Sequence, residues 1–141
     1  MPDILQSIHI DAPLTKVRTS LATIDGLAAW WTRTTSGDAG PGGKIDFRFG
    51  EHVTQVRVDA AAPARVQWTV LNSNPDWDTT RMTFELEPVG DRTLLRFGHR
   101  GWREANAFFG HCSMKWATFL LSLRGELEAG EGRPFPDDIA I

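Results

Sequence analysis

Histidine and cysteine are the side-chain types in this 141-residue chain that best suit acid–base, nucleophilic or metal chemistry. None of the four histidines belongs to an HExxH motif, and the single cysteine forms no zinc-ligand pattern with them. The chain also has neither the GxxxxGKS/T motif that cradles phosphates nor the GxGxxG motif of dinucleotide sites. We therefore predict no metal ion and no cofactor.

His99 is the candidate catalytic residue. It shares its strand parity with Leu95 and Phe97, so its side chain is expected to face the interior of the protein. An imidazole in an internal cavity could act as an acid or a base near neutral pH. The alternative is a half-exposed histidine at a strand end with no chemical role.

Cys112 lies between Phe109 and Trp116 on an apolar helical stripe, where a thiol acts as a small hydrophobic side chain with a raised pKa. The adjacent His111 would point about 100° away on a helix, which disfavours a cysteine–histidine nucleophile. A lone cysteine forms no intrachain disulfide and is kept reduced most easily inside the cell. We therefore predict a cytoplasmic location.

Arg96 and Arg100 have the opposite parity from His99 and are expected on the outer side of the same strand. Two arginines on one strand face could bind carboxylates, because a guanidinium group donates paired hydrogen bonds to a carboxylate. The alternative is an ordinary solvated basic edge.

The charge and hydropathy of the chain exclude two classes of partner. Fifteen basic and eighteen acidic residues give a net charge of −3, so general nucleic-acid binding lacks its usual electrostatic driving force. No apolar run approaches the ~20 residues that cross a bilayer, so no membrane partner is expected.

Aromatic side chains are abundant and almost free of hydroxyl groups: there are six tryptophans, eight phenylalanines and no tyrosine. This composition favours an apolar interior or an apolar cavity. Each aromatic side chain alone is best explained by core packing. If a helix stands away from the sheet, however, the inward side chains line a pocket, and the predicted ligand-binding residues are Trp31, Phe47, Phe49, Trp68, Phe84, Phe97, His99, Phe108, Cys112 and Trp116.

Hydrophobic periodicity predicts the elements that would position these side chains. Alternating apolar and polar residues predict strands over 4–10, 45–49, 55–59, 66–70, 82–87 and 94–97. Two short helices follow the first strand: one carries Leu14, Val17 and Leu21, and the second follows a break at Asp25-Gly26. Helical spacing from about 105 to 129 predicts a helix of roughly 35 Å. Residues 32–43 are predicted as a loop, its glycine-rich part 37–43 as a flexible cavity rim, and 72–77 as a lid.

This order of elements predicts an α+β fold in a single domain over residues 1–141. A curved, six-stranded antiparallel sheet is expected to wrap around the long C-terminal helix, with the two short helices after strand one. Space between the sheet and the helix is the expected binding site.

The chain resembles the SRPBCC superfamily of START/Bet v 1-like helix-grip domains, and within it the activator of heat-shock-protein ATPase homologue type. The residues that carry the resemblance span nearly the whole chain: Ile8-His9-Ile10-Asp11-Ala12-Pro13, Val17, Leu21, Leu27, Trp30-Trp31, Pro41 to Phe47, Gly50, Trp116, Leu120 to Leu123 and Glu128-Ala129-Gly130. Most of these are packing and turn residues. The resemblance therefore implies architecture more directly than chemistry.

The resemblance leaves three functions open. The first is a non-enzymatic module, of the kind found in stress response, that binds a hydrophobic or lipid-like small molecule in an internal cavity. The second is an aromatase/cyclase-type enzyme that acts in the same cavity. The third is a co-chaperone-like domain that stimulates a chaperone ATPase. A homodimer is also left open.

Overall fold

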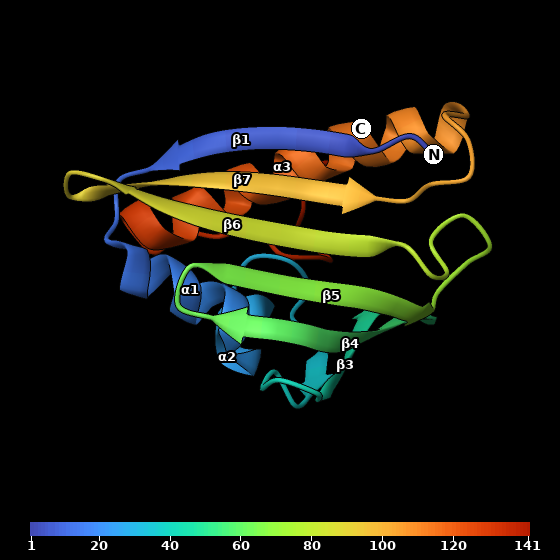
Figure 1. The fold of residues 1–141 in the computed structure, drawn as a ribbon, viewed down its shortest axis with the longest axis horizontal. Helices are drawn as coiled ribbons and strands as arrows, with labels where there is room; N and C mark the ends of the chain where they lie inside the picture. Colours follow the sequence, from blue (N-terminus) through green and yellow to red (C-terminus); the bar gives the residue numbers. More distant parts are fainter.

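The computed structural model describes Met1–Ile141 and contains one open antiparallel sheet with strand order β1-β7-β6-β5-β4-β3-β2 (Figure 1). The seven strands are β1 (Ile4–Ile10), β2 (Thr35–Gly37), β3 (Lys44–Phe49), β4 (His52–Ala62), β5 (Arg65–Asn72), β6 (Arg81–Val89) and β7 (Arg92–Arg100). The α+β class and the antiparallel sheet are confirmed.

The strand count predicted from the sequence is wrong by one. β2 lies within residues 32–43, which were expected to be loop, and it pairs with β3 through Thr35↔Phe47 and Gly37↔Ile45. None of its three residues is buried, so it shows no alternation of apolar and polar residues. Its pairing partner, rather than its own sequence, makes this segment a strand.

Two short helices follow β1 as expected: α1 (Leu14–Ala22) and α2 (Ile24–Ala28). The boundary between them lies at Thr23 and not at Asp25-Gly26. The Thr23 hydroxyl oxygen accepts a hydrogen bond of 3.0 Å from the Gly26 backbone N–H, which caps α2 and leaves Asp25 and Gly26 inside it.

The long helix α3 (Ala107–Ala129) begins and ends on residues that satisfy its free backbone groups. The Asn106 side chain accepts a 2.9 Å hydrogen bond from the Phe109 N–H. At the other end Gly130 has φ 69°, a left-handed conformation that favours glycine. The predicted helix over 105–129 is therefore confirmed to within two residues.

The three helices lie on one face of the sheet, as Figure 1 shows. α3 runs behind β1, β7 and β6, and no helix covers the opposite face, which we call the open face. Inward residues such as Ile45 and Phe47 are fully buried, whereas their neighbours Lys44 and Arg48 are exposed. No helix is both long and apolar enough to cross a membrane. The cytoplasmic location stays a prediction.

Aromatic side chains fill the middle of the space between the sheet and α3. The Trp31 ring lies 4.2 Å from Phe47 and 5.9 Å from Trp68, between ring centroids. On β7, the centroid of the Phe97 ring lies 4.5 Å from that of Trp116 on α3. The two layers are therefore in direct contact at their centre, and open space remains only toward one end.

A candidate apolar binding pocket at one end of the sheet

A pocket of about 340 Å³ lies where the first half of α3 meets the β3–β4 hairpin, the β5–β6 loop and the C-terminal segment after α3. Its aromatic lining is contributed by all four of these elements and by the segment after α2. The pocket is lined by Trp31, Phe49, His52, Thr54, Ser73, Asn74, Trp77, Phe108, His111, Cys112, Lys115, Trp116, Phe119, Phe135 and Asp138.

Trp31 and Trp116 form the wall that separates the pocket from the core. Their ring centroids are 5.0 Å apart, and Phe49 lies 5.4 Å from Trp31 on the strand side. Trp31 is placed there by α2, which ends just before it, and Trp116 lies on the sheet-facing side of α3. Both tryptophans are almost fully buried, so this wall is rigid and apolar.

The β5–β6 loop supplies a second wall, and hydrogen bonds from its backbone to the Asn74 side chain hold its shape. The Asn74 side-chain oxygen accepts hydrogen bonds from the N–H groups of Asp76 and Trp77 at 3.1 and 3.0 Å. This turn places the Trp77 ring in a stack on Trp116, with centroids 6.2 Å apart and planes 14° apart. The segment predicted as a lid therefore borders the pocket, and its movement stays a prediction.

The C-terminal segment closes the remaining side. The Phe135 N–H donates to the Trp31 carbonyl oxygen at 2.8 Å, and the Arg33 N–H donates to the Phe135 carbonyl oxygen at 3.2 Å. Farther along, Lys115 of α3 forms an ion pair with Asp138 at the pocket rim. This segment takes the place of residues 37–43 as the rim, since none of those residues lines the pocket.

Polar groups stand opposite this ion pair, on the β4 side of the rim. The Ser73 hydroxyl lies 3.2 Å from His52 Nε2 and 2.7 Å from the Thr54 hydroxyl, within hydrogen-bond distance of both. The Lys115 ammonium group is 5.2 Å from the centre of the Phe119 ring, where cation and ring attract each other. The pocket thus combines apolar walls with polar groups gathered at its rim.

His99 lies behind this pocket and does not line it. Its Nδ1 atom accepts a 3.0 Å hydrogen bond from the Trp116 indole N–H. Because the indole only donates, the neutral imidazole carries its hydrogen on Nε2, which donates to the Thr80 hydroxyl at 2.8 Å. The Thr80 hydroxyl in turn donates to the Trp77 carbonyl oxygen. Both ring nitrogens are therefore engaged in supporting the pocket walls.

The two roles considered for His99 both disagree with this position. The side chain has no exposed area, so it is not a half-exposed residue at a strand end. Burial lowers its pKa to about 3 from an ordinary value of 6.5, because the charged imidazolium loses its hydration. His99 therefore faces no open cavity in which it could act as an acid or a base near neutral pH.

Cys112 behaves as its sequence position indicates. Its side chain is buried on the apolar side of α3 and contributes to the pocket wall. Burial is the main cause that raises the pKa of the Cys112 thiol to about 11, so the thiol stays protonated near neutral pH.

The structure divides the ten predicted ligand-binding residues by position. Five line the pocket: Trp31, Phe49, Phe108, Cys112 and Trp116. The other five lie in the closed core beneath it: Phe47, Trp68, Phe84, Phe97 and His99. The inward parity was right for all five of these strand residues, but neighbouring side chains fill the space in front of them. Ligand contact for the five pocket residues stays a prediction.

Several pocket residues are missing from the ligand-binding set predicted from the sequence. Lys115 and Phe119 share a helical face with Phe108 and Cys112, so the i, i+4, i+7 and i+11 spacing was an available signal. Phe135 and Asp138 had no such signal, because an irregular segment carries no periodicity. No group of three or more histidine, cysteine, aspartate or glutamate side chains is placed to hold a metal ion.

An antiparallel sheet with one face packed on a long C-terminal helix, and with two short helices after its first strand, is the SRPBCC-type helix-grip fold. Residues 11–128 match the family described as activator of Hsp90 ATPase homolog 1-like protein (AHSA1). The chain belongs to this family. No curated protein sequence matches the chain.

Solved structures agree with this assignment. The chain is similar to the Aha1 protein of Colwellia psychrerythraea, which is described as a dimer in solution, with 41% identity and a TM-score of 0.86 over 94% of this chain and 100% of that chain. MLL2253 from Mesorhizobium loti is 21% identical with a TM-score of 0.78, over 90% of this chain and 97% of that one. CalU16 from Micromonospora echinospora is 18% identical with a TM-score of 0.76, over 91% and 77%. The last two similarities show the fold alone.

Proposed function

We propose that the protein binds a small, flat and largely apolar molecule in the pocket bounded by α3, the β3–β4 hairpin, the β5–β6 loop and the C-terminal segment. The observation that carries this proposal is the distribution of chemistry in the pocket, with aromatic rings on its walls and hydrogen-bonding groups at its rim. Its volume of about 340 Å³ is at the small end of the range for ligand pockets. Transfer of apolar surface from water into it would contribute about 25 cal/mol per Å².

The rim indicates what the polar end of such a ligand would meet. His52, Thr54 and Ser73 offer nitrogen and hydroxyl groups on one side, and the Lys115–Asp138 ion pair lies on the other. Because the ion pair already balances its own charge, the pocket favours a ligand with one neutral or weakly charged polar group over a highly charged ligand.

The proposal can be tested with N-phenyl-1-naphthylamine, a neutral aromatic probe that fluoresces in apolar sites. Cys112→Phe places a ring in the pocket, and we expect it to weaken probe binding by about tenfold, because the added ring occupies ligand volume. Ser7→Phe adds the same ring at an exposed position of β1 and should leave binding unchanged. Equal binding by a folded Cys112→Phe protein would contradict the proposal.

Native mass spectrometry of the freshly purified protein gives a second, independent measurement. Ligand carried through purification should appear as added mass that is lost on denaturation. The Cys112→Phe protein should carry less of it than the Ser7→Phe protein.

The structure gives the cyclase-type reaction no support at His99, because that side chain lies outside the pocket. The proposal is therefore binding without covalent chemistry.

A second candidate function is stimulation of an Hsp90-type chaperone ATPase. The specific observation in its favour is 41% identity to a protein named Aha1 whose solved chain is matched over its entire length. Its test is the ATPase rate of the Hsp90 from the same organism with and without the protein. Stimulation that survives Cys112→Phe would assign this activity to a surface other than the pocket.

A further inference from the structure

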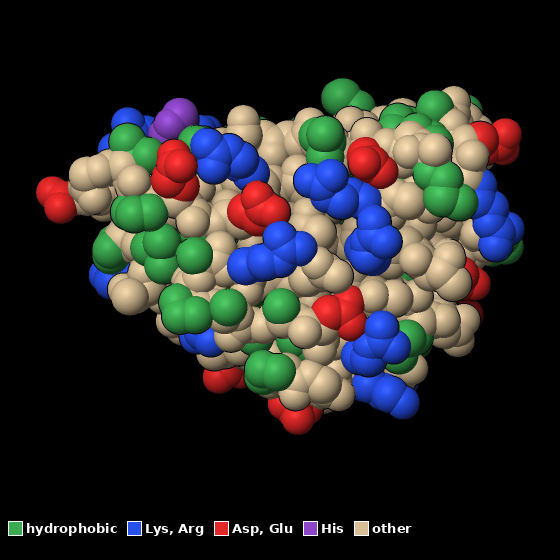
Figure 2. Space-filling view, viewed as in Figure 1, with side chains coloured by type: hydrophobic (Ala, Val, Ile, Leu, Met, Phe, Trp, Pro, Cys, Tyr) green, Lys and Arg blue, Asp and Glu red, His purple; other side chains and the backbone are tan.

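The open face of the sheet carries a surplus of positive charge although the whole chain is acidic. Figure 2 shows Lys and Arg side chains spread over this face among fewer acidic ones. Strand parity places eight basic side chains there, Lys44, Arg48, Arg57, Arg65, Arg81, Arg92, Arg96 and Arg100, and five acidic ones, Asp3, Asp46, Asp59, Glu85 and Glu87. The net charge of the full chain is −3, so the surplus is local.

Four of these basic residues stand in one row across the strands. Strand register pairs Lys44 with Arg57, Arg57 with Thr69, Thr69 with Arg81, and Arg81 with Arg100. We call Lys44, Arg57, Arg81 and Arg100 the basic row. With strands about 4.8 Å apart, the row crosses four spacings and is about 19 Å long.

The row is unfavourable for the isolated fold. Two of its register pairs, Lys44↔Arg57 and Arg81↔Arg100, place like charges directly opposite each other, which destabilises an antiparallel sheet. The ion pairs of Arg57 with Asp59 and of Arg100 with Asp3 offset part of this repulsion, but Lys44 and Arg81 have no compensating charge. An acidic surface laid over the row would remove this repulsion.

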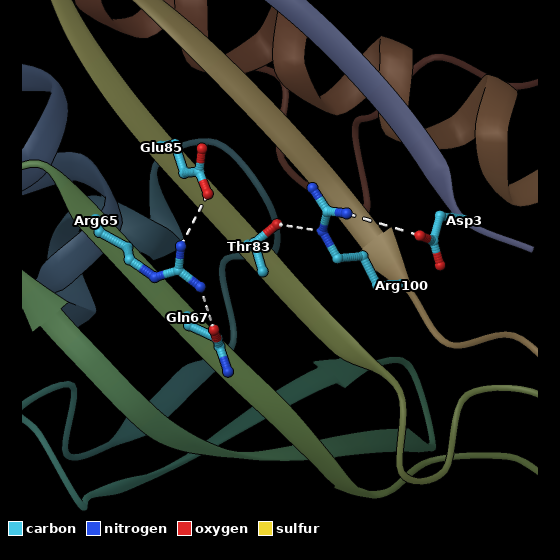
Figure 3. Close-up of polar contacts among 6 residues, drawn as sticks. All are labelled: Asp3, Arg65, Gln67, Thr83, Glu85 and Arg100. Atoms are coloured by element: carbon cyan, nitrogen blue, oxygen red, sulfur yellow. Dashed lines mark hydrogen bonds and ion pairs between the residues drawn. The ribbon is translucent and has the colours of Figure 1, made fainter. Parts of the chain in front are cut away.

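Arg100 is held in place before any partner arrives. Its Nε–H donates to the Thr83 hydroxyl at 3.2 Å, and its guanidinium group lies 3.6 Å from the Asp3 carboxylate (Figure 3). The guanidinium group lies next to Gly98, where an added Cβ would come within 2.8 Å of Arg100 Nε. An arginine fixed in this way loses less side-chain freedom on binding.

Arg57 is likewise fixed, by Asp59 at 2.9 Å. Partial burial acts to raise the pKa of Asp59, but hydrogen bonds from Thr69, Arg57 and Gln67 outweigh it and lower the pKa. Asp59 therefore remains charged and balances Arg57 near neutral pH. Lys44 and Arg81 are exposed and have no ion-pair partner, so they are the two uncompensated charges of the row.

We propose that the open face docks an acidic helix of a partner protein, laid across the strands along the basic row. One turn of an α-helix advances 5.4 Å, close to the strand spacing, so carboxylates at i, i+4, i+7 and i+11 span about 16 Å and follow the row. Leu5 beside Arg100 is 61% exposed and offers the helix an apolar contact. Asp3 and Asp59 interrupt the positive charge, which disfavours the continuous phosphates of a nucleic acid.

The test uses a fluorescein-labelled alanine-based peptide of about 18 residues with glutamates at i, i+4, i+7 and i+11. A peptide of the same composition with its glutamates spread around the helix is the ligand control. Fluorescence anisotropy should show tighter binding of the striped peptide, and the difference should shrink as salt rises from about 20 to 300 mM because the charges are exposed.

The double variant Lys44→Glu/Arg81→Glu should weaken binding of the striped peptide by about tenfold or more. Its matched control is Lys16→Glu/Arg124→Glu, which makes the same charge change at exposed positions on α1 and α3, off the open face, and should bind like the unmodified protein. The milder double variant Lys44→Gln/Arg81→Gln should bind the striped peptide with intermediate affinity. If circular dichroism shows that the charge-reversal variant is unfolded, the glutamine variant takes its place in the test.

Equal peptide binding by the row variants and the control variant would overturn the proposal. So would row-dependent binding of a single-stranded oligonucleotide or of phosphatidylserine vesicles that is tighter than that of the striped peptide. Pocket function is separate from this result, because both double variants should bind the neutral probe N-phenyl-1-naphthylamine as the unmodified protein does.

Discussion

At the scale of single residues, one buried histidine connects the sheet to two tryptophans that line the pocket, Trp116 and Trp77. The hydrogen bonds run from Trp116 to His99, from His99 to Thr80, and from Thr80 to the Trp77 backbone. Trp77 also meets the His99 ring edge to face, with centroids 4.8 Å apart. His99 is therefore a structural residue of the wall.

This arrangement predicts a stability that depends on pH. The folded pKa of His99, about 3, is below its ordinary value of 6.5, so between these pH values the unfolded chain binds a proton that the folded chain does not. The contribution of neutral His99 is complete above pH 6.5 and is lost as the pH falls from 6.5 toward 3. The free energy of unfolding should decrease by up to about 1.4 kcal/mol per pH unit from this group.

Urea titrations between pH 4.5 and 7.5 measure this dependence. His99→Gln should be less stable than the unmodified protein at pH 7, and its free energy of unfolding should vary less steeply with pH. His9→Gln replaces an exposed histidine on β1 and should keep the original slope. An unchanged slope in His99→Gln would show that another group causes the dependence.

At the scale of elements, the start of α3 determines how the helix approaches the pocket. Asn106 caps the helix through the Phe109 N–H and also donates to Asp76 of the β5–β6 loop at 3.3 Å. The cap therefore joins two walls of the pocket, and the ring of Phe108 follows directly after it.

Asn106→Ala removes this cap and should lower the free energy of unfolding by about 1 kcal/mol. Asn106→Ser keeps a capping oxygen and should lose only a few tenths of a kcal/mol. Chemical denaturation followed by circular dichroism compares the two. Equal losses for serine and alanine would mean that the loop contact, which both variants lack, and not the cap, is what matters.

At the scale of the whole molecule, the surface of α3 that faces solvent is poor in charge. Gly110, Met114, Ala117 and Leu121 recur at helical spacing, and Met114 and Leu121 are 59% and 45% exposed. A protein 41% identical to this one is described as a dimer. The homodimer that the sequence leaves open stays a prediction, and this stripe is the surface on which it can be tested.

Leu121→Glu should shift the protein toward monomer, because it places a charge in the expected interface. Val89→Glu makes the same change at a residue that is 44% exposed at the end of β6, and should leave the molar mass unchanged. Light scattering after size-exclusion chromatography gives the mass of each. A monomeric unmodified protein at micromolar concentration would reject the dimer.

A single domain over residues 1–141, as predicted from the sequence, should unfold as one unit. It implies that circular dichroism and tryptophan fluorescence report one coincident unfolding transition.

The sequence alone predicts most of the strands and the long helix, but it does not predict the complete lining of the pocket. The alternation in β3 and the spacing from Cys112 to Leu123 reflect which residues a regular backbone turns inward, and a regular backbone repeats at known periods. β2 was not predicted, because a strand of three residues, none of them buried, is defined by its neighbour β3.

The sequence by itself determined the α+β class, the long helix α3, the family and the inward parity of His99. Only the tertiary structure decided that Phe84 and Phe97 are packed core while Phe49 and Phe135 line a pocket. Periodicity tells which side of an element is apolar, but not which side chains from distant segments occupy the space in front of it. That depends on how α3, the loops and the C-terminal segment come together.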